Sequence, residues 1–240
     1  MSRHLAVLAC GIVLSSATPA LAQMQWTDKG FVSLSGGIQT GTSDVGNTVT
    51  FDQYGETATL VTTQDVKGGP FFDIAAGYRV WRNLAVGASY TFLQSKSDAA
   101  IAGTIPDPIF FDTLRDVSAS ASDLNHRETW IAGLLTWGLP ITDKIDILIS
   151  GGPAFVTVEQ ELLTDATVSE PGPSLTNLTA TKVSESAMGF MVGADVRYMV
   201  TSRIGVGVLA KFATASVDLT DDVKMDAGGF QVGGGVRIKF

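Results

Sequence analysis

The stretch FQVGGGVRIKF, residues 230–240, alternates large apolar side chains with small or charged ones. A period of two residues is typical of a β-strand, in which successive side chains point to opposite faces. One face carries phenylalanine, valine and isoleucine, whereas the other carries glutamine, glycine, arginine and lysine. A large apolar face opposite a small and charged face predicts a strand that lies between lipid and a crowded interior.

Seven further segments repeat this rhythm: 32–38, 72–80, 84–92, 130–137, 145–155, 188–198 and 204–212. Their second face consists mainly of glycine, alanine and serine, with occasional charges. In a soluble β-sandwich the second face would be exposed to water and would be more polar. Small residues such as these are more typical of a crowded interior. We therefore expect an all-β protein, an eight-stranded antiparallel up-and-down transmembrane β-barrel, and we regard an ordinary soluble β-protein as the rival interpretation.

The connections between these segments alternate strictly in length. Short connections cover 81–83, 139–144 and 199–203, and long ones cover 40–69, 94–127, 159–183 and 219–225. Outer-membrane barrels combine short periplasmic turns with longer extracellular loops. Within the first long loop, residues 48–62 alternate around Tyr54-Gly55, which indicates a protruding hairpin. Expected girdle aromatics are Tyr78, Trp81, Tyr198 and Phe240 below, and Phe72, Phe92, Trp130, Phe155, Phe212 and Phe230 above.

The start of the chain predicts a secretory signal peptide over residues 1–22, followed by the barrel domain over 23–240. Arg3 and His4 precede an apolar run, and Ala20-Leu21-Ala22 supplies a small-x-small cleavage site. A lipoprotein cleavage box at Leu8-Ala9-Cys10 is the weaker alternative. The expected location is the bacterial outer membrane, reached through the periplasm.

The composition excludes several functional classes. The 240 residues contain one cysteine and two histidines, and the formal net charge is −8. A single cysteine rules out a disulfide framework and a cysteine-based zinc site, and the acidic balance argues against nucleic-acid binding. We therefore expect no catalytic residue, no cofactor and no metal.

The end of the chain, Gly235-Val236-Arg237-Ile238-Lys239-Phe240, resembles the assembly signal of the eight-stranded outer-membrane β-barrel family, the OmpX, opacity-protein and OmpA-barrel group. The elements of that signal are Gly235, Ile238 and the terminal aromatic Phe240. Gly233 departs from the pattern, because a polar residue is usual there. The resemblance implies that the barrel-assembly machinery reads this strand, and that the mature protein is a monomer among outer-membrane lipids and lipopolysaccharide.

Charged residues on the small face form the first candidate site. They are Asp73, Arg79, Asp146, Asp195, Arg197, Lys211, Arg237 and Lys239. Because eight strands leave room only for side chains or one small ligand, we expect a paired lumen charge network that fills the interior. The alternative is a charged filter of a narrow channel for small solutes.

His126 is the second candidate, since some outer-membrane barrels are lipid-modifying or proteolytic enzymes with a histidine at the rim. Asp123 and Ser122 are near it in sequence, but no enzyme motif surrounds it, so we expect a solvated loop histidine.

The third candidate is the second long loop, in which an apolar run includes Ile105, Ile109, Phe110 and Phe111. Exposed apolar side chains can bind a partner, or they can pack onto the barrel rim. We expect a non-enzymatic protein with a structural or surface-interaction role, whose loops contact an extracellular partner.

Overall fold

The alternating segments form antiparallel β-strands in a computed structural model, which describes residues 26–170, 173–221 and 223–240. The predicted signal peptide and both candidate cleavage sites lie outside the described residues. The strands are β1 (Gly30–Thr40), β2 (Thr42–Gln53), β3 (Glu56–Lys67), β4 (Pro70–Trp81), β5 (Leu84–Pro106), β6 (Leu114–Pro140), β7 (Ile145–Ser169), β8 (Ser174–Met199), β9 (Ile204–Thr220) and β10 (Val223–Lys239).

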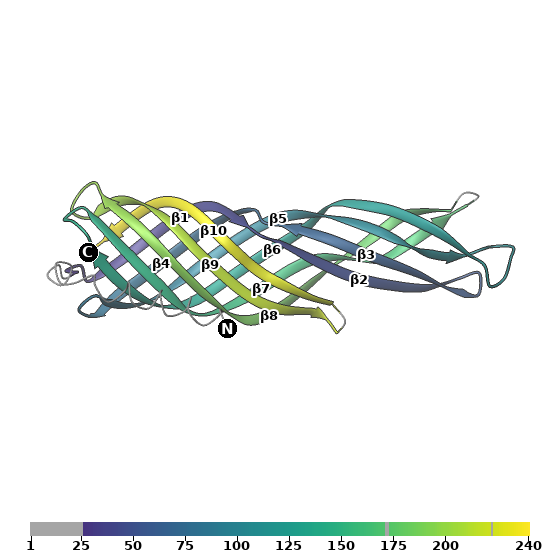
Figure 1. The fold of residues 1–240 in the computed structure, drawn as a ribbon, viewed down its shortest axis with the longest axis horizontal. Coiled ribbons are helices and arrows are strands. Elements are labelled where there is room, and N and C mark those ends of the chain that lie inside the picture. The colour runs from purple at the N-terminus through teal and green to yellow at the C-terminus, as the bar shows by residue number, and fades with distance from the viewer. Residues whose placement is uncertain (1–25, 171–172, 222) are drawn as a thin grey trace, which may run out of the picture.

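Eight of these strands close into a barrel (Figure 1). The ring runs β1, β4, β5, β6, β7, β8, β9 and β10, and β10 returns to β1. The closing seam pairs Phe31 with Lys239 at one end and Thr40 with Phe230 at the other. Closure leaves the backbone groups of the wall paired on both sides, as a lipid environment requires.

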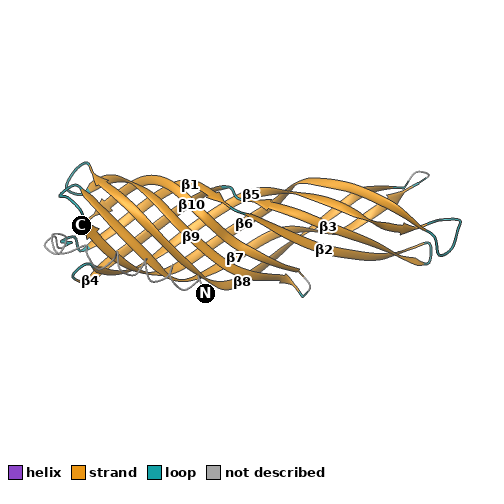
Figure 2. Ribbon diagram, in the orientation of Figure 1, coloured by secondary structure: helices purple, strands orange, loops and turns teal. Residues whose placement is uncertain are grey.

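The expected total of eight strands is corrected to ten, whereas the all-β barrel class is confirmed. The additional pair, β2 and β3, forms the protruding hairpin expected within the first long connection, and β3 pairs with the upper part of β5. The second and third long connections are also mostly strand, because β5 to β8 continue far beyond the barrel (Figure 2). The expectation that these two connections are long loops is therefore corrected: most of their residues continue the strands.

The wall of the barrel shows its large apolar side chains to the outside. Phe72, Phe155, Phe212 and Phe230 are each between 46% and 48% exposed, in line with their expected place in the upper girdle. Serine, threonine and charged side chains lie inside, for example Ser33 and Thr91. None of the described residues belongs to a helix that is long and apolar enough to cross a membrane.

Trp130 departs from the expected girdle, because it lies inside the barrel with 0% exposure. Trp130 and Trp137 are an odd number of residues apart, and the β6–β7 register continues between them without a shift. Their side chains therefore point to opposite faces of β6, and only Trp137 faces outward.

Above the barrel, the long strands form an extension with the opposite pattern of polarity. Its buried core contains Leu60 from β3, Ile101 and Ile105 from β5, Val117 from β6 and Leu163 from β7. Polar side chains cover its outside, as in a water-soluble β-protein. The extension carries the β2–β3, β5–β6 and β7–β8 turns to the end of the molecule opposite the C-terminus (Figure 1).

Candidate functional site

A cluster of two arginines and an aspartate fills the lower lumen. Asp195 accepts hydrogen bonds from Arg237 Nε at 2.9 Å and Nη2 at 2.7 Å, and from Arg197 Nε at 2.7 Å. Arg197 Nη2 also donates to Ser33 Oγ at 3.1 Å. Gly207 on β9 makes this contact possible, because a Cβ there would lie 2.7 Å from Arg237 Nε.

Asp146 lies beside this cluster, 3.9 Å from Arg197 Nε. All three partners in the cluster are at most 7% exposed, so the two positive charges depend on Asp195 and Asp146 for compensation. The structure thus brings together four residues of the predicted lumen network.

A second ion pair lies higher in the lumen, where β4, β5 and β9 face one another. Lys211 Nζ contacts Asp73 Oδ2 and donates to Thr91 Oγ1 at 2.6 Å, and Thr91 Oγ1 donates to Asp73 at 2.7 Å. The Lys211 nitrogen also lies 5.5 Å from the centre of the Phe71 ring. This pair adds a second charged layer to the lumen.

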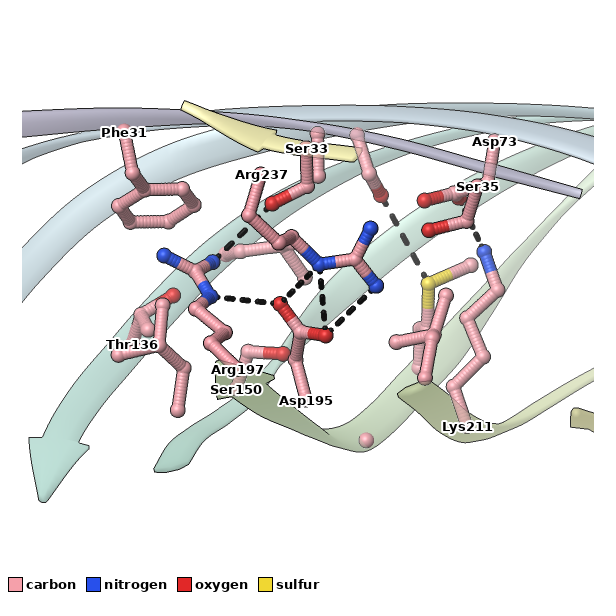
Figure 3. A pocket seen from close by; sticks show the side chains of 17 residues that line it. Phe31, Ser33, Ser35, Asp73, Thr136, Ser150, Asp195, Arg197, Lys211 and Arg237 are labelled. Carbon is pink, nitrogen blue, oxygen red and sulfur yellow. Dashed lines mark hydrogen bonds and ion pairs between the residues drawn. The ribbon is translucent and has the colours of Figure 1, made fainter. Parts of the chain in front are cut away.

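A cavity of about 40 Å³ separates the two charged layers (Figure 3). Ser35 and Thr136 line it, and their buried hydroxyl oxygens have no hydrogen-bond partner in the structure. A cavity of this size has room for about three water molecules, which such hydroxyls would bind. The lumen therefore consists of two charged layers with a small chamber between them, whose lining contains both polar and apolar side chains.

Two further residues of the predicted network lie apart from these layers. Arg79 donates to the backbone oxygens of Trp26 at 2.7 Å and Thr27 at 3.0 Å, and Lys239 pairs with Asp28 at 3.0 Å. Both therefore fix the segment before β1 at the end of the barrel opposite the extension. Their positions on the strands place both residues near the lumen. Their hydrogen-bond and ion-pair partners, however, come from the segment before β1.

His126 belongs to a buried polar layer at the junction of barrel and extension, and the prediction of a solvated histidine is wrong. We call this the junction layer: Gln39, His126, Glu128, Gln160 and Gln231, each at most 3% exposed. His126 Nδ1 lies 2.7 Å from Gln160 Oε1, and Nε2 lies 3.1 Å from Glu128 Oε1. Trp130 Nε1 donates to Glu128 Oε2 at 2.8 Å.

The sequence contains a signal for this layer in the spacing of three residues of β6. His126, Glu128 and Trp130 are spaced two residues apart, so they share the inward face of one strand. The residues around His126 are also polar, so this part of the sequence resembles a loop and the signal is weak. Both ring nitrogens of His126 have partners, and the side chain is only 1% exposed.

The predicted apolar loop divides into a buried and an exposed part. Ile105 is fully buried in the core of the extension. Ile109, Phe110 and Phe111 are 80%, 66% and 72% exposed at the turn between β5 and β6, and we call these three residues the apolar tip. Ile105 is therefore a core residue, and the structure leaves the apolar tip as the candidate contact surface.

Hydrogen bonds hold the turn that carries the apolar tip. Asp107 Oδ1 accepts from the backbone nitrogens of Ile109 at 2.8 Å and Phe110 at 3.1 Å, and Asp107 N donates to Thr113 O at 2.8 Å. These backbone donors hold the pKa of Asp107 below its ordinary value. The turn is thus defined by local bonds around one carboxylate.

Neighbouring turns are tied to the same place. Arg115 pairs with Glu170 at the β7–β8 turn and lies 3.4 Å from Asp107 Oδ2, and Tyr54 of the β2–β3 turn donates to Glu170 at 3.4 Å. The hydrogen bond from Arg115 lowers the pKa of Glu170. Three turns are therefore fixed to one another, and the apolar tip projects from a preorganised support.

The residues of the predicted assembly signal lie at the closing seam. Phe240 N donates to Gly30 O at 3.0 Å, and Phe240 O accepts from Gly30 N at 2.9 Å. Gly235 allows β10 to approach β1 closely, because a Cβ there would lie 1.9 Å from Leu34 O. Ile238 faces outward with 37% exposure.

A family model described as "Outer membrane protein beta-barrel domain" matches residues 6–240. The chain belongs to this outer-membrane β-barrel family. Its members are outer-membrane proteins of Gram-negative bacteria, which places this chain in the bacterial outer membrane. A search of curated proteins finds no match.

Several solved structures are similar to this chain at low sequence identity. The outer membrane protease OmpT of Escherichia coli is 9% identical, with 90% of this chain and 98% of that chain covered and a TM-score of 0.50. OprG of Pseudomonas aeruginosa is 10% identical over 89% and 97%, with a TM-score of 0.46. The attachment invasion locus protein Ail of Yersinia pestis is 12% identical over 88% and 99%, with a TM-score of 0.39.

Proposed function

We propose that this outer-membrane barrel is a non-enzymatic surface-interaction protein that presents its apolar tip to an extracellular partner. The observation that carries the proposal is the exposure of three consecutive apolar side chains, Ile109, Phe110 and Phe111, at the end of the extension. Aromatic anchors in a rigid setting are typical of binding hot spots, because little conformational entropy is lost on binding.

The bonding around the apolar tip supports this proposal. A turn that only covered the extension would bury its apolar side chains, as Ile105 is buried. Here Asp107 and Arg115 fix the backbone while the three side chains remain in water. Exposed apolar area costs solubility, so its presentation on a fixed turn favours a binding role.

The contents of the lumen support a closed scaffold rather than the alternative, a narrow channel. Two charged layers and the junction layer lie inside the barrel, and Phe71, Leu93 and Trp130 are buried as well. Recording from the purified protein in planar bilayers tests this alternative, and we expect no steady conductance at neutral pH. Steady ion-selective openings would favour the channel instead.

The burial of His126 likewise supports a non-enzymatic role over a lipid-modifying or proteolytic rim enzyme. A general base must come within hydrogen-bond reach of its substrate, and both nitrogens of this ring are engaged inside the protein. If a hydrolytic or lipid-modifying activity of the protein disappears in His126→Ala, this part of the proposal is wrong.

The direct test replaces the apolar tip without touching the core. Ile109→Ser, Phe110→Ser and Phe111→Ser are combined in one variant, and Val61→Ser, which removes another exposed apolar side chain of the extension, serves as the control. Adhesion of bacteria that display each protein is measured on cell layers and immobilised matrix proteins. We expect the tip variant to lose about tenfold or more in adhesion and the control to retain it. Equal adhesion of all three proteins would refute the proposal.

A further inference from the structure

The apolar tip lies in a strongly acidic part of the surface. Three turns meet at the end of the extension, where β2 joins β3, β5 joins β6 and β7 joins β8 (Figure 1). Their described residues, 52–57, 106–116 and 169–170, contain six carboxylates but only one cation, Arg115. The end of the extension is therefore strongly negative at neutral pH.

The single arginine does not offset this charge at the surface. Arg115 Nη2 lies 2.5 Å from Glu170 Oε1, and Nε lies 3.4 Å from Asp107 Oδ2. The side chains of all three residues are at most 27% exposed. Arg115 is therefore used within the support of the apolar tip, and a partner that approaches the tip meets carboxylates rather than this cation.

Four further carboxylates belong to these turns, and we call them the acidic border: Asp52, Glu56, Asp112 and Asp116. Glu56 Oε1 accepts a hydrogen bond from the Asp112 backbone nitrogen at 2.9 Å, which fixes the β2–β3 turn beside the turn of the tip. Asp52, Asp112 and Asp116 are exposed, and within the described part of the chain none of the four takes part in an ion pair. Their charges are therefore available to a partner.

Further apolar side chains lie in the same turns as the acidic border. Tyr54 is 45% exposed and Leu114 is 58% exposed, and they are two residues away from Glu56 and Asp112 in the sequence. Exposed apolar and exposed acidic side chains thus share one small surface. An uncharged apolar partner would cover the carboxylates without supplying a counter-charge, and an anionic partner would be repelled by them.

The lower part of the extension differs, because it contains charges of both signs. Lys67 lies 4.0 Å from Asp98, and Lys96 lies 2.8 Å from Asp123. Each of these exposed carboxylates has a cation of its own chain, so a cation of another molecule gains little there. The acidic border lacks such partners, which makes the end of the extension the better surface for cations that another molecule supplies.

We propose that the apolar tip and the acidic border together bind a basic amphipathic protein segment, in which lysine or arginine accompanies apolar side chains. The apolar side chains of this segment contact the tip, while its cations form charge-assisted hydrogen bonds with the acidic border. The negative turns also attract a cationic partner before contact, which accelerates association. This inference rests on the proposed function of the tip and adds the chemistry of its partner.

The test uses the full barrel in phosphatidylcholine nanodiscs and three immobilised probes: two synthetic peptides and phosphatidylcholine vesicles. The peptides have equal length and the same leucine and tryptophan positions, and all other positions are lysine in one and glutamate in the other. Binding is measured by surface plasmon resonance at low and at high salt, with empty nanodiscs as the blank. Heat-modifiable migration reports folding.

Two charge variants are compared with the original protein and with the tip variant, I109S/F110S/F111S. D52N/D112N/D116N, the border variant, removes three charges of the acidic border, and asparagine suits position 112, where φ is 58°. D44N/D218N/D226N, the control variant, removes three exposed charges away from the tip.

We expect the original protein to bind the lysine peptide at least about tenfold more tightly than the glutamate peptide or the vesicles, and salt to weaken this binding. The border variant should lose about tenfold in affinity for the lysine peptide and most of the salt dependence, because three ion pairs are removed. The tip variant should also lose about tenfold. The control variant should bind like the original protein.

Several results would overturn the inference: equal affinity for both peptides, no binding of either, tighter binding to the vesicles, an unchanged affinity of the border or the tip variant, or an equal loss in the control variant. After any of these results, the proposed function still stands if the tip variant loses adhesion to cells and matrix proteins. Unchanged adhesion of the tip variant would instead refute the proposed function.

Discussion

The barrel and the extension share strands β5 to β8 but have opposite distributions of polarity. Along β7, even-numbered residues from Asp146 to Gln160 point inward throughout. In the barrel the outward residues are Ile149 and Phe155, and above it they are Glu159 and Glu161. The direction of the side chains stays constant while the surrounding solvent changes from lipid to water. The comparison shows that composition follows the solvent, whereas strand geometry continues unchanged.

The junction layer lies where this reversal takes place. Gln39 of β1 contacts Gln231 of β10 and lies 3.4 Å from Glu128 of β6, so three strands of the ring are linked there. Above it the interior is apolar, and below it the interior contains the buried ion pairs. A layer of hydrogen-bonded side chains separates two interiors that are stabilised by different interactions.

The largest effect is expected at the closing seam, on which the barrel depends and the extension does not. Deletion of Phe240 removes the backbone bonds to Lys29 and Gly30 and the terminal aromatic of the assembly signal. The shortened protein should accumulate in the periplasm and lose heat-modifiable migration on gels. Normal yield in the outer membrane would show that the last residue is dispensable for assembly.

The lumen offers the next largest effect. Asp195→Ala leaves two buried arginines without their main partner, which should destabilise the barrel by about 3–5 kcal/mol. Unfolding by urea in lipid vesicles measures the change. Asp218→Ala is the matched control, because its pair with Lys224 is about 70% exposed and should cost about 1 kcal/mol or less. Similar stabilities of the two variants would contradict a buried ion-pair cluster.

Ile105→Ala tests whether the two regions are stabilised separately. This fully buried side chain belongs to the core of the extension, and its truncation should cost about 2–5 kcal/mol there. Amide exchange should increase in β2, β3 and the upper part of β5 but stay unchanged in the barrel. Faster exchange throughout the barrel would mean that the two regions unfold as one unit.

The smallest effect concerns the turn at the apolar tip in acid. The pKa values of Asp107 and Glu170 are lowered from ordinary values of 3.8 and 4.5, so the folded turn favours their ionised forms. Their contribution is present above these ordinary values and is lost as the pH falls below them through the lowered pKa values. Amide exchange of Ile109 and Phe110 should rise below about pH 4 before the rest of the extension changes. In Asp107→Asn this pH dependence should weaken, and an unchanged profile would argue against the carboxylate as its cause.

The sequence predicts the barrel wall better than the extension, for reasons that particular residues make clear. In the wall, residues such as Phe72 and Ile74 alternate with small or charged residues. Every outward position of such a strand contacts lipid and therefore favours an apolar side chain. In β5 above the wall, buried Ala99 and Ile101 alternate with aspartate and alanine, which resembles a polar loop. Because the two faces of the upper strands differ little in polarity, the sequence does not predict these strands.

The candidate sites were predictable to a similar, limited degree. The positions of Asp195, Arg197 and Arg237 on their strands predict that they lie close together, and the hydrogen bonds between them agree with this. It did not reveal that Arg79 bonds the backbone before β1, because that partner has no alternating pattern. Nor did it show that Ile105 is buried while Phe110 is exposed, since this depends on where the turn begins.

Lipid surrounds the lower part of β7 and water surrounds its upper part, while odd-numbered residues up to Glu161 point outward in both. The predicted mature chain, residues 23–240, has no cysteine, so single cysteines at Ile149, Phe155, Glu159 and Glu161 can carry a spin label. Power saturation with oxygen and with a water-soluble nickel complex then reports the solvent at each site. We expect higher accessibility to oxygen than to nickel at Ile149 and Phe155, and the reverse at Glu159 and Glu161. Higher accessibility to nickel than to oxygen at all four positions would contradict this expectation.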